Sequence, residues 1–230
     1  MRLSVVIPTL DEERFVAAAV ASVREAADEV LVVDGGSSDR TRAVATGAGA
    51  RVIESPRGRG VQLHCGARET TGDWLVFLHA DTRLEAGWRR AVETLALDPE
   101  VVGGAFRFAL DTTHPARRYS EWAVALRCRL LGLPFGDQAI FCRRSAYERT
   151  GGFTSEPLFE DLAFFRALRR LGPTTLPPVR AVSSPRRWQR DGPVLTTLRN
   201  NALLVLFLAG VAPARLARFY PAEPAPAKGR

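Results

Sequence analysis

The chain has 230 residues, of which 46% are hydrophobic and 25% are charged, and its formal net charge is +7. This composition excludes a largely disordered chain, because the apolar material is sufficient to offset the conformational entropy lost on folding. The three cysteines, Cys65, Cys128 and Cys142, show no CxxC or zinc-ligand spacing, which excludes a disulfide-stapled scaffold and is typical of core thiols in a reducing compartment.

The first half of the chain alternates between short apolar strands and helices. Strands are expected at Leu3–Ile7, Val30–Val33, Arg51–Ile53 and Trp74–Leu78, and helices at about Glu12–Ala27, Ser38–Gly47, Val61–Arg68 and Gly87–Leu97. Continuous apolar strands between helices are typical of a parallel sheet that is covered on both faces. Because crossover connections are right-handed, the C-terminal ends of these strands meet at one edge of the sheet.

The second half of the chain is less regular. It predicts a strand over Val101–Leu110 that is interrupted at Gly103-Gly104, further strands at Gln138–Cys142 and Val179–Val182, and helices at Ala116–Leu131, Glu160–Leu171 and Val194–Leu208. No repeat or linker divides the chain. We therefore expect one domain over residues 1–220 and a disordered, Pro/Ala-rich tail over residues 221–230.

The positive charge is concentrated in the C-terminal third, where residues 162–230 contain twelve Arg or Lys and two acidic residues. The apolar stretch Ala202–Val211, between Arg199 and Arg215, predicts either a helix at an anionic membrane surface, where a lipid-linked acceptor would be presented, or a helix packed on the core. No nucleic-acid recognition motif accompanies the basic residues, so no nucleic-acid partner is expected.

No export signal is visible, and the longest apolar run is shorter than the roughly 20 residues that a membrane-spanning helix needs. We therefore expect a cytoplasmic protein, peripheral at the inner membrane face if the helix binds lipid. The sequence does not predict an oligomeric state.

Carboxylates follow three of the four expected N-terminal strands. Asp11 and Glu12 come after the first, Asp34 ends the second and Asp81 follows the fourth. Ligands of open α/β sheets bind at this edge, so the three positions indicate a site for a metal ion or a polar ligand. Each also has a local structural interpretation: Thr9 and Glu12 fit a capping box, Asp34 with the glycines and serines after it fits a strand-to-helix turn, and Asp81 fits a turn cap.

Three motifs resemble family 2 glycosyltransferases of the GT-A fold: Ser4–Glu13 (SVVIPTLDEE), Val32–Asp39 (VVDGGSSD) and Phe77–Asp81 (FLHAD). The resemblance extends from about Leu3 to Trp188. It implies an α/β GT-A fold, with a mostly parallel central sheet and helices on both faces. The segments Arg57–Gln62, Phe135–Gln138 and Glu160-Asp161 also resemble a subgroup of small bacterial enzymes that is often linked to arsenosugar biosynthesis.

The resemblance implies that several residues hold a nucleotide-sugar donor. These residues are Pro8, Thr9, Glu12, Asp34, Arg59 and Asp81. A carboxylate such as that of Asp34 can accept the imide N–H of uracil or two donors from guanine. Arg59 would approach the base or the diphosphate; alternatively, it is a solvated arginine.

The resemblance also implies a divalent metal, Mn²⁺ or Mg²⁺, at Asp81, where it would bridge the diphosphate oxygens and act as a Lewis acid. His79 occupies the position at which the family commonly has a first Asp. Histidine can ligate Mn²⁺ but suits Mg²⁺ poorly. His79 is therefore expected either as a metal ligand or as a core residue that supports the metal site.

Asp161 matches the family's general base, which takes the proton of an acceptor hydroxyl on the face opposite the leaving group. The alternative is that Glu160 and Asp161 only interact with a helix dipole. Asp137 and Gln138 are expected in the acceptor pocket, and Glu160 is expected to act on acceptor binding. Arg186, Arg187 and Trp188 would close over the diphosphate, the alternative being a solvated basic turn.

These observations predict an inverting glycosyltransferase that moves a sugar from a nucleotide sugar to the hydroxyl of a small-molecule or lipid-linked acceptor. The segment after the first strand lacks the glycine-rich and basic features of a nucleotidyltransferase and the GxGxxG of a dinucleotide oxidoreductase. The alternative is a degenerate protein that binds a nucleotide sugar or a partner without turnover. The missing first Asp of the metal motif favours that alternative, whereas Asp81 and Asp161 favour the enzyme.

Overall fold

The computed structural model describes residues 1–220, apart from the side chains of residues 193 and 194, so the tail expected at 221–230 lies outside the described residues. The main sheet contains, in spatial order, β3 (Arg51–Glu54), β2 (Glu29–Asp34), β1 (Leu3–Thr9), β4 (Trp74–Phe77), β8 (Ile140–Arg143), β6 (Gly103–Ala105) and β9 (Thr174–Thr175). A smaller sheet contains β5 (Thr82–Leu84), β10 (Arg180–Ser183) and β7 (Arg107–Leu110).

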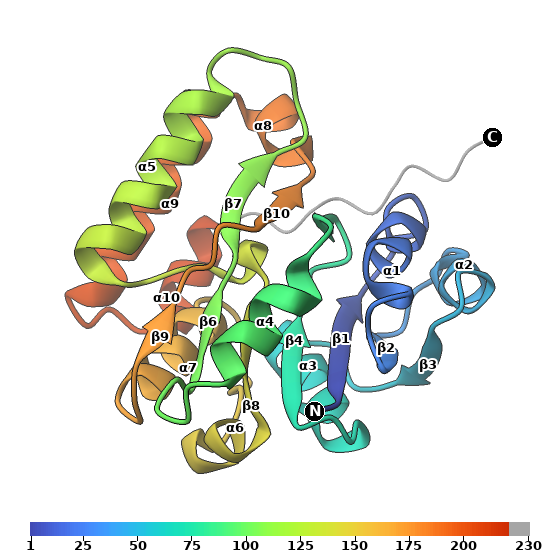
Figure 1. Cartoon of the computed structure of the whole chain (residues 1–230). Helices are drawn as coiled ribbons and strands as arrows, with labels where there is room; N and C mark the ends of the chain where they lie inside the picture. Colours follow the sequence, from blue (N-terminus) through green and yellow to red (C-terminus); the bar gives the residue numbers. More distant parts are fainter. Residues whose placement is uncertain (221–230) are drawn as a thin grey trace.

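Helices connect and cover these strands (Figure 1). They are α1 (Val16–Arg24), α2 (Thr41–Gly47), α3 (Arg59–Glu69), α4 (Trp88–Ala96), α5 (Arg117–Leu131), α6 (Arg144–Thr150), α7 (Glu160–Arg169), α8 (Arg186–Asp191), α9 (Pro193–Leu208) and α10 (Pro213–Leu216), with 3₁₀ turns η1 (Gly136–Gln138) and η2 (Ala217–Phe219).

The main sheet is mostly parallel, as expected. Strands β3, β2, β1 and β4 all run parallel, β8 runs antiparallel to both β4 and β6, and β9 runs parallel to β6. Thr9 and Asp34 are register partners at the ends of β1 and β2. The C-terminal ends of neighbouring strands therefore do meet at one edge.

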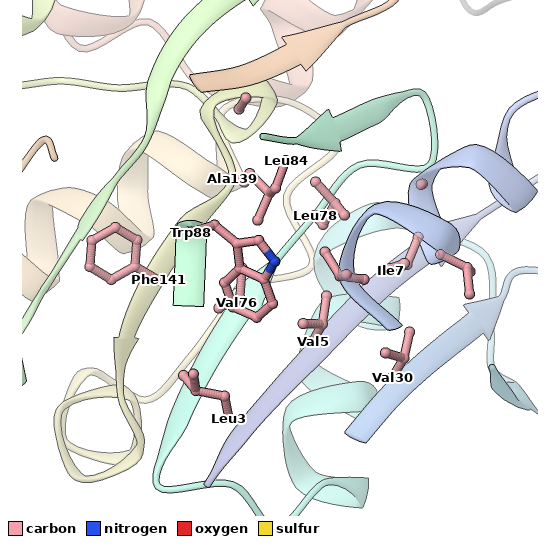
Figure 2. Packing of buried hydrophobic residues seen from close by; sticks show 14 of the residues in the cluster. Leu3, Val5, Ile7, Val30, Val76, Leu78, Leu84, Trp88, Ala139 and Phe141 are labelled. Atoms are coloured by element: carbon pink, nitrogen blue, oxygen red, sulfur yellow. The ribbon is translucent and has the colours of Figure 1, made fainter. Parts of the chain in front are cut away.

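Both faces of the main sheet are buried, which explains why its strands are continuously apolar. On one face, Val5 and Ile7 of β1 belong to a cluster with Val76 and with Trp88 of α4, which α1 and α2 complete (Figure 2). On the other face, Val6 belongs to a second cluster, formed with side chains of α3, α6 and α7. Burial of apolar area at about 25 cal/mol per Å² makes these two layers the main source of stability.

The capping box expected at Thr9 is wrong, and the first helix is shorter than predicted. Helix α1 begins at Val16, because the residues before it form a loop in which Asp11 has a φ of 53°. The Thr9 hydroxyl donates a hydrogen bond to Asp34 Oδ1 at 3.2 Å instead of capping a helix.

The interruption expected at Gly103-Gly104 is also wrong, because both glycines lie within β6. A Cβ on Gly103 would lie 2.4 Å from the carbonyl oxygen of Phe141, and one on Gly104 would lie 2.1 Å from that of Thr175. The glycines therefore let neighbouring strands approach closely. The break falls instead at Phe106, between β6 and β7.

The C-terminal helix α9 packs on the core with one side only. Leu203 and Leu204 are buried in a third cluster with Phe159 and Leu162, so the predicted packing role is confirmed. Five large apolar side chains of the same helix are more than 40% exposed: Leu195, Leu198, Val205, Leu206 and Leu208. Within residues 1–220, no helix combines the length and apolar character needed to cross a bilayer.

Candidate active site

A cleft of about 750 Å³ opens at the edge where β1 and β4 end. The size is typical of a small-molecule site. Ten of the predicted site residues line it: Pro8, Thr9, Glu12, Arg59, His79, Asp81, Asp137, Asp161, Arg187 and Trp188. Three do not, namely Asp34, Gln138 and Glu160.

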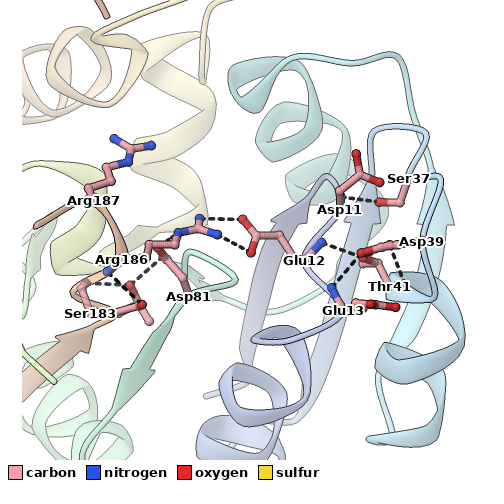
Figure 3. A network of polar contacts seen from close by, with 12 residues as sticks. Asp11, Glu12, Glu13, Ser37, Asp39, Thr41, Asp81, Ser183, Arg186 and Arg187 are labelled. Atoms are coloured by element: carbon pink, nitrogen blue, oxygen red, sulfur yellow. Dashed lines mark hydrogen bonds and ion pairs between the residues drawn. The ribbon is translucent and has the colours of Figure 1, made fainter. Parts of the chain in front are cut away.

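The acidic loop after β1 is held by hydrogen bonds to the loop after β2 and to the first residue of α2 (Figure 3). The backbone N–H of Asp11 donates to Ser37 Oγ at 2.9 Å, and that of Glu12 donates to Thr41 Oγ1 at 2.7 Å. The N–H of Glu13 donates to Asp39 Oδ2 at 3.1 Å. These bonds leave the Glu12 side chain directed across the cleft.

Asp34 holds the turn after β2. Its Oδ2 accepts the N–H groups of Gly36 and Ser37 at 3.0 and 2.8 Å, and its Oδ1 accepts the hydroxyls of Ser37 and Thr9 at 2.5 and 3.2 Å. The side chain is fully buried. The turn interpretation is therefore confirmed; Asp34 does not line the cleft, and its contact with a nucleotide base stays a prediction.

Arg186 joins both sides of the cleft, which corrects the description of this segment as a solvated basic turn (Figure 3). Its guanidinium donates to both carboxylate oxygens of Glu12 at 2.7 and 2.8 Å and pairs with Asp81 Oδ2 at 3.0 Å. It also lies 5.0 Å from the ring centroid of Phe15. The first residue of α8 thus connects the loops that follow β1 and β4.

The donor atoms available for a metal are few. Across the described residues, no three His, Cys, Asp or Glu side chains meet closely enough to form a metal site by themselves. Asp81 Oδ2 is paired with Arg186, while its Oδ1 accepts a long, 3.4 Å hydrogen bond from Thr82. Burial and the charge of Arg59 lower the pKa of His79 to about 4, so its imidazole is neutral at pH 7. One carboxylate and one neutral imidazole fit a cation whose other ligands come from a bound diphosphate.

Two carboxylates lie deeper in the cleft, Asp161, which is buried, and Asp137, which is half-buried. Asp161 is 7% exposed, and its Oδ2 accepts the N–H of Gly136 at 2.5 Å. Burial raises the pKa of Asp161, and the neighbouring charge of Glu160 raises it further. Burial also raises the pKa of Asp137 to about 6, although Arg127 opposes the shift. A raised pKa makes a carboxylate a better proton acceptor near neutral pH.

Glu160 is buried beneath Arg59 and does not reach the cleft, which contradicts its predicted contact with the acceptor. It is 1% exposed and forms an ion pair with Arg59 Nε. Burial alone would raise the pKa of Glu160, but the charge of Arg59 and the hydrogen bonds to the carboxylate together outweigh it, and the pKa is lowered. Arg59 is therefore not the solvated arginine of the alternative interpretation: Glu160 holds it at the wall of the cleft.

Gln138 is a structural residue, and its predicted place in the acceptor pocket is wrong. It lies in the turn η1, not in a strand, and is 1% exposed. Its Oε1 accepts from Arg127 Nη2 at 3.1 Å and from Cys128 Sγ at 3.2 Å, and its amide donates to the carbonyl of Phe106 at 3.0 Å. The side chain thus joins α5 to the β6–β7 junction.

Two residues that the sequence interpretation did not assign also shape the cleft. The amide of Gln62 donates to the carbonyls of Thr9 and Val33 at 2.7 and 2.8 Å and so fixes the ends of β1 and β2. Tyr220 accepts a hydrogen bond from Arg187, whose guanidinium lies 5.0 Å from the Tyr220 ring centroid. Gln62 belongs to the same sequence motif as Arg59, and this could have indicated it. No local sequence pattern indicated Tyr220.

The chain is similar to proteins that are named as glycosyltransferases. Residues 4–157 match the model of the family described as Glycosyl transferase family 2. An uncharacterised glycosyltransferase of Mycobacterium tuberculosis is 37% identical over 86 residues, covering 37% of this chain and 39% of the relative. The undecaprenyl-phosphate 4-deoxy-4-formamido-L-arabinose transferase of Sodalis glossinidius is 32% identical over 163 residues, covering 64% of this chain and 49% of the relative. The chain spans half or less of the length of these curated relatives.

Solved structures share the fold and thereby confirm the expected GT-A architecture. Glucosyl-3-phosphoglycerate synthase of Mycobacterium tuberculosis, in complex with Mn²⁺ and UDP-glucose, superposes with a TM-score of 0.58 at 21% identity, covering 80% of this chain and 69% of the other. TarS of S. aureus, in complex with UDP-GlcNAc, superposes with a TM-score of 0.63 at 14% identity, covering 80% and 58%.

Proposed function

The chain belongs to glycosyl transferase family 2, and we propose that its cleft transfers a sugar, with inversion, from a nucleotide-diphosphate sugar to the hydroxyl of an acceptor. One observation carries this proposal. Asp81, Asp137 and Asp161 come from three separate segments and line one cleft together with Arg59 and with the arginines of α8. Carboxylates for metal binding and acid–base chemistry thus share one cleft with guanidinium groups suited to a diphosphate.

The donor would occupy the side of the cleft formed by β1 and α8. Pro8, Thr9 and Glu12 line this side, and Arg59 and Arg187 approach it from the walls. Arg186 already lies between the loops after β1 and β4, so a diphosphate entering there meets a guanidinium in position. Arginine suits this role because its planar group donates two parallel hydrogen bonds to phosphate oxygens.

Asp81 would hold the divalent cation, with His79 as a second protein ligand for Mn²⁺. The bound cation would supply Lewis-acid stabilisation of the negative charge on the leaving diphosphate. The neutral state of the His79 imidazole supports its role as a ligand, because a protonated ring has no lone pair to offer. The pairing of Asp81 with Arg186 adds a second positive charge at the same place.

Asp161 would act as the general base. As the acceptor oxygen bonds to the anomeric carbon and the bond from that carbon to the diphosphate oxygen breaks, the acceptor proton moves to the Asp161 carboxylate. Asp137 would orient the acceptor, because its buried Oδ1 has no hydrogen-bond partner among the described residues. The acceptor is a small molecule or a lipid-linked molecule; the name of the Sodalis relative includes undecaprenyl phosphate, which illustrates the second class. Membership of the arsenosugar-linked subgroup and a cytoplasmic location stay predictions.

The test is thermal unfolding with a panel of UDP- and GDP-sugars, each with and without Mn²⁺. A ligand that binds only the native state raises the melting temperature by mass action. We expect at least one nucleotide sugar to do so, and to release its nucleoside diphosphate when an acceptor is added. Stabilisation with no release for any acceptor would favour the degenerate binding protein, and no stabilisation by any donor would contradict the proposal.

A further inference from the structure

Helix α5 carries an apolar stripe that faces solvent. Tyr119, Trp122, Leu126 and Leu130 are 58%, 59%, 36% and 70% exposed. Their spacing of three, four and four residues places them on one side of the helix, opposite the buried Cys128. The rings of Tyr119 and Trp122 lie 6.2 Å apart, so the aromatic groups form one continuous surface. Exposed apolar stripes of this kind mark interaction sites.

Helix α9 carries a second stripe. Leu195, Leu198 and Val205 are about 60% exposed and share one side of the helix, while Leu203 on another side is buried against the core. Both helices lie at the end of the molecule away from α2 and β3 (Figure 1). The two stripes are called the α5–α9 face below.

Arginines flank the α5 stripe. Arg118 and Arg129 are exposed, and their separation of eleven positions, three helical turns, places both beside Trp122. Helix α5 contains four Arg and one Glu, and residues 193–220 contain three Arg and no acidic residue. The apolar stripes therefore lie in a strongly positive part of the molecule.

We propose that the α5–α9 face binds the surface of an anionic phospholipid bilayer. Tyr and Trp favour the boundary between headgroups and acyl chains, because an apolar ring and a polar group are both accommodated there. Arginines beside them pair with lipid phosphates, each contributing about 1 kcal/mol at an anionic surface. A second copy of the chain fits less well, because a symmetric contact through this face would bring like charges together.

This binding would also place the cleft near the bilayer. The side of α9 that turns inward contributes Thr196, Asn200 and Leu203 to the cleft wall. The inference rests on surface residues alone and does not depend on the proposed glycosyl transfer.

The test is co-sedimentation of the full chain with phosphatidylglycerol-containing vesicles, with pure phosphatidylcholine vesicles for comparison. We expect binding to anionic vesicles at low salt, loss of binding at about 0.5 M salt where charges are screened, and a blue shift of tryptophan emission on binding that substitution of Trp122 removes. Trp122→Ser combined with Leu130→Ser, and separately Arg118→Glu combined with Arg129→Glu, should each weaken binding at least about tenfold. Exposed positions on α4 and at its C-terminal end provide the α4 controls: Arg90→Glu, and Leu97→Ser at an 83% exposed leucine, should leave binding unchanged.

Any one of three outcomes would overturn the proposal. The first is no binding to anionic vesicles at low salt, and the second is an equal loss of vesicle binding in the α4 controls and in the α5 variants. A third is a stable dimer in sedimentation velocity that the Trp122 and Leu130 substitutions dissociate, because a second copy would then cover the face. Melting temperatures of all variants establish that they are folded, since surface substitutions usually change stability by about 0.5 kcal/mol or less.

Discussion

The Asp161→Asn substitution removes a proton acceptor from the cleft and barely changes the size of the side chain. Loss of a general base lowers turnover by about 10²–10⁴-fold. At 1.36 kcal/mol per factor of ten, this is about 3 to 5.5 kcal/mol of transition-state stabilisation. Donor affinity should stay nearly unchanged, because the proposed donor contacts lie on other elements of the cleft.

The substitution also has a structural cost that can be estimated. Asp161 Oδ2 accepts the N–H of Gly136 at 2.5 Å, and its Oδ1 accepts the N–H of Leu162 at 2.7 Å. Asn has one carbonyl oxygen, so one of these N–H groups would face an NH₂ group and lose a hydrogen bond to a charged acceptor, which is worth about 1.5–3 kcal/mol. Removing a buried charge next to Glu160 offsets part of this loss. We expect a net destabilisation of about 1–2 kcal/mol.

Three measurements separate the two effects: turnover at saturating donor and acceptor, donor affinity by calorimetry, and urea unfolding. Glu160→Gln is the matched control, because Glu160 is the adjacent buried carboxylate but does not line the cleft. It should change donor affinity through its ion pair with Arg59 and leave the proton transfer in place. Near wild-type turnover in Asp161→Asn would refute the assignment, and Asp137 would be the next candidate for the base. A loss of donor binding in parallel with turnover would indicate a structural role alone.

Three further predictions concern the metal, the charge of a cleft carboxylate, and the packing. Asp81→Ala should abolish the Mn²⁺-dependent part of nucleoside-diphosphate affinity in calorimetry without changing the circular dichroism spectrum; unchanged affinity would remove Asp81 from the metal site. The fold raises the pKa of Asp137 from 3.8 to about 6. The protonated group therefore favours folding below pH 3.8, and this contribution is lost as the pH rises through 6. Asp137→Asn should accordingly gain about 2 kcal/mol more stability at pH 8 than at pH 4. A pH-independent difference between the urea midpoints would contradict this. Gly66→Ala should lower the stability by about 1–3 kcal/mol, because a Cβ there would lie 2.3 Å from Val6 Cγ1. Gly47→Ala is the control: a Cβ there meets nothing within 4 Å, so the substitution should be neutral or stabilising. Equal melting temperatures for the two variants would show that the contact at Gly66 relaxes freely.

The sequence by itself determined the fold class and the position of the ligand-binding edge. Runs such as Leu3–Ile7 and Val30–Val33 have only one plausible location, a strand buried on both faces, because their continuous β-branched and apolar side chains cannot face water. Strands of this kind between helices determine a parallel sheet, and the sheet determines where Asp81 lies. The local sequence pattern was sufficient to predict this architecture, because the burial of a strand and the handedness of a crossover connection depend on residues that are close together in the sequence.

Side-chain partners were decided by the tertiary structure alone. Glu160 has the residue type expected of a ligand contact, yet it supports Arg59, which lies 101 positions earlier in the chain. Gln138 likewise joins buried elements away from the cleft. Each of these partners depends on which distant segments pack together, and the residue pattern around a side chain contains no record of that.

Arg186 is the example in which the two partners are farthest apart in the sequence. The sequence placed its segment either over a diphosphate or in a solvated turn and did not indicate its partner Glu12, which lies 174 positions earlier in the chain. Strand β10 pairs with β5, and the N–H of Ser184 donates to the carbonyl of Asp81, so the start of α8 lies beside the loop after β4. The stripe on α5 is a similar case: periodicity predicts one apolar side of a helix, but the neighbours that fill or leave open that side are set by the whole fold, and here they leave it to solvent.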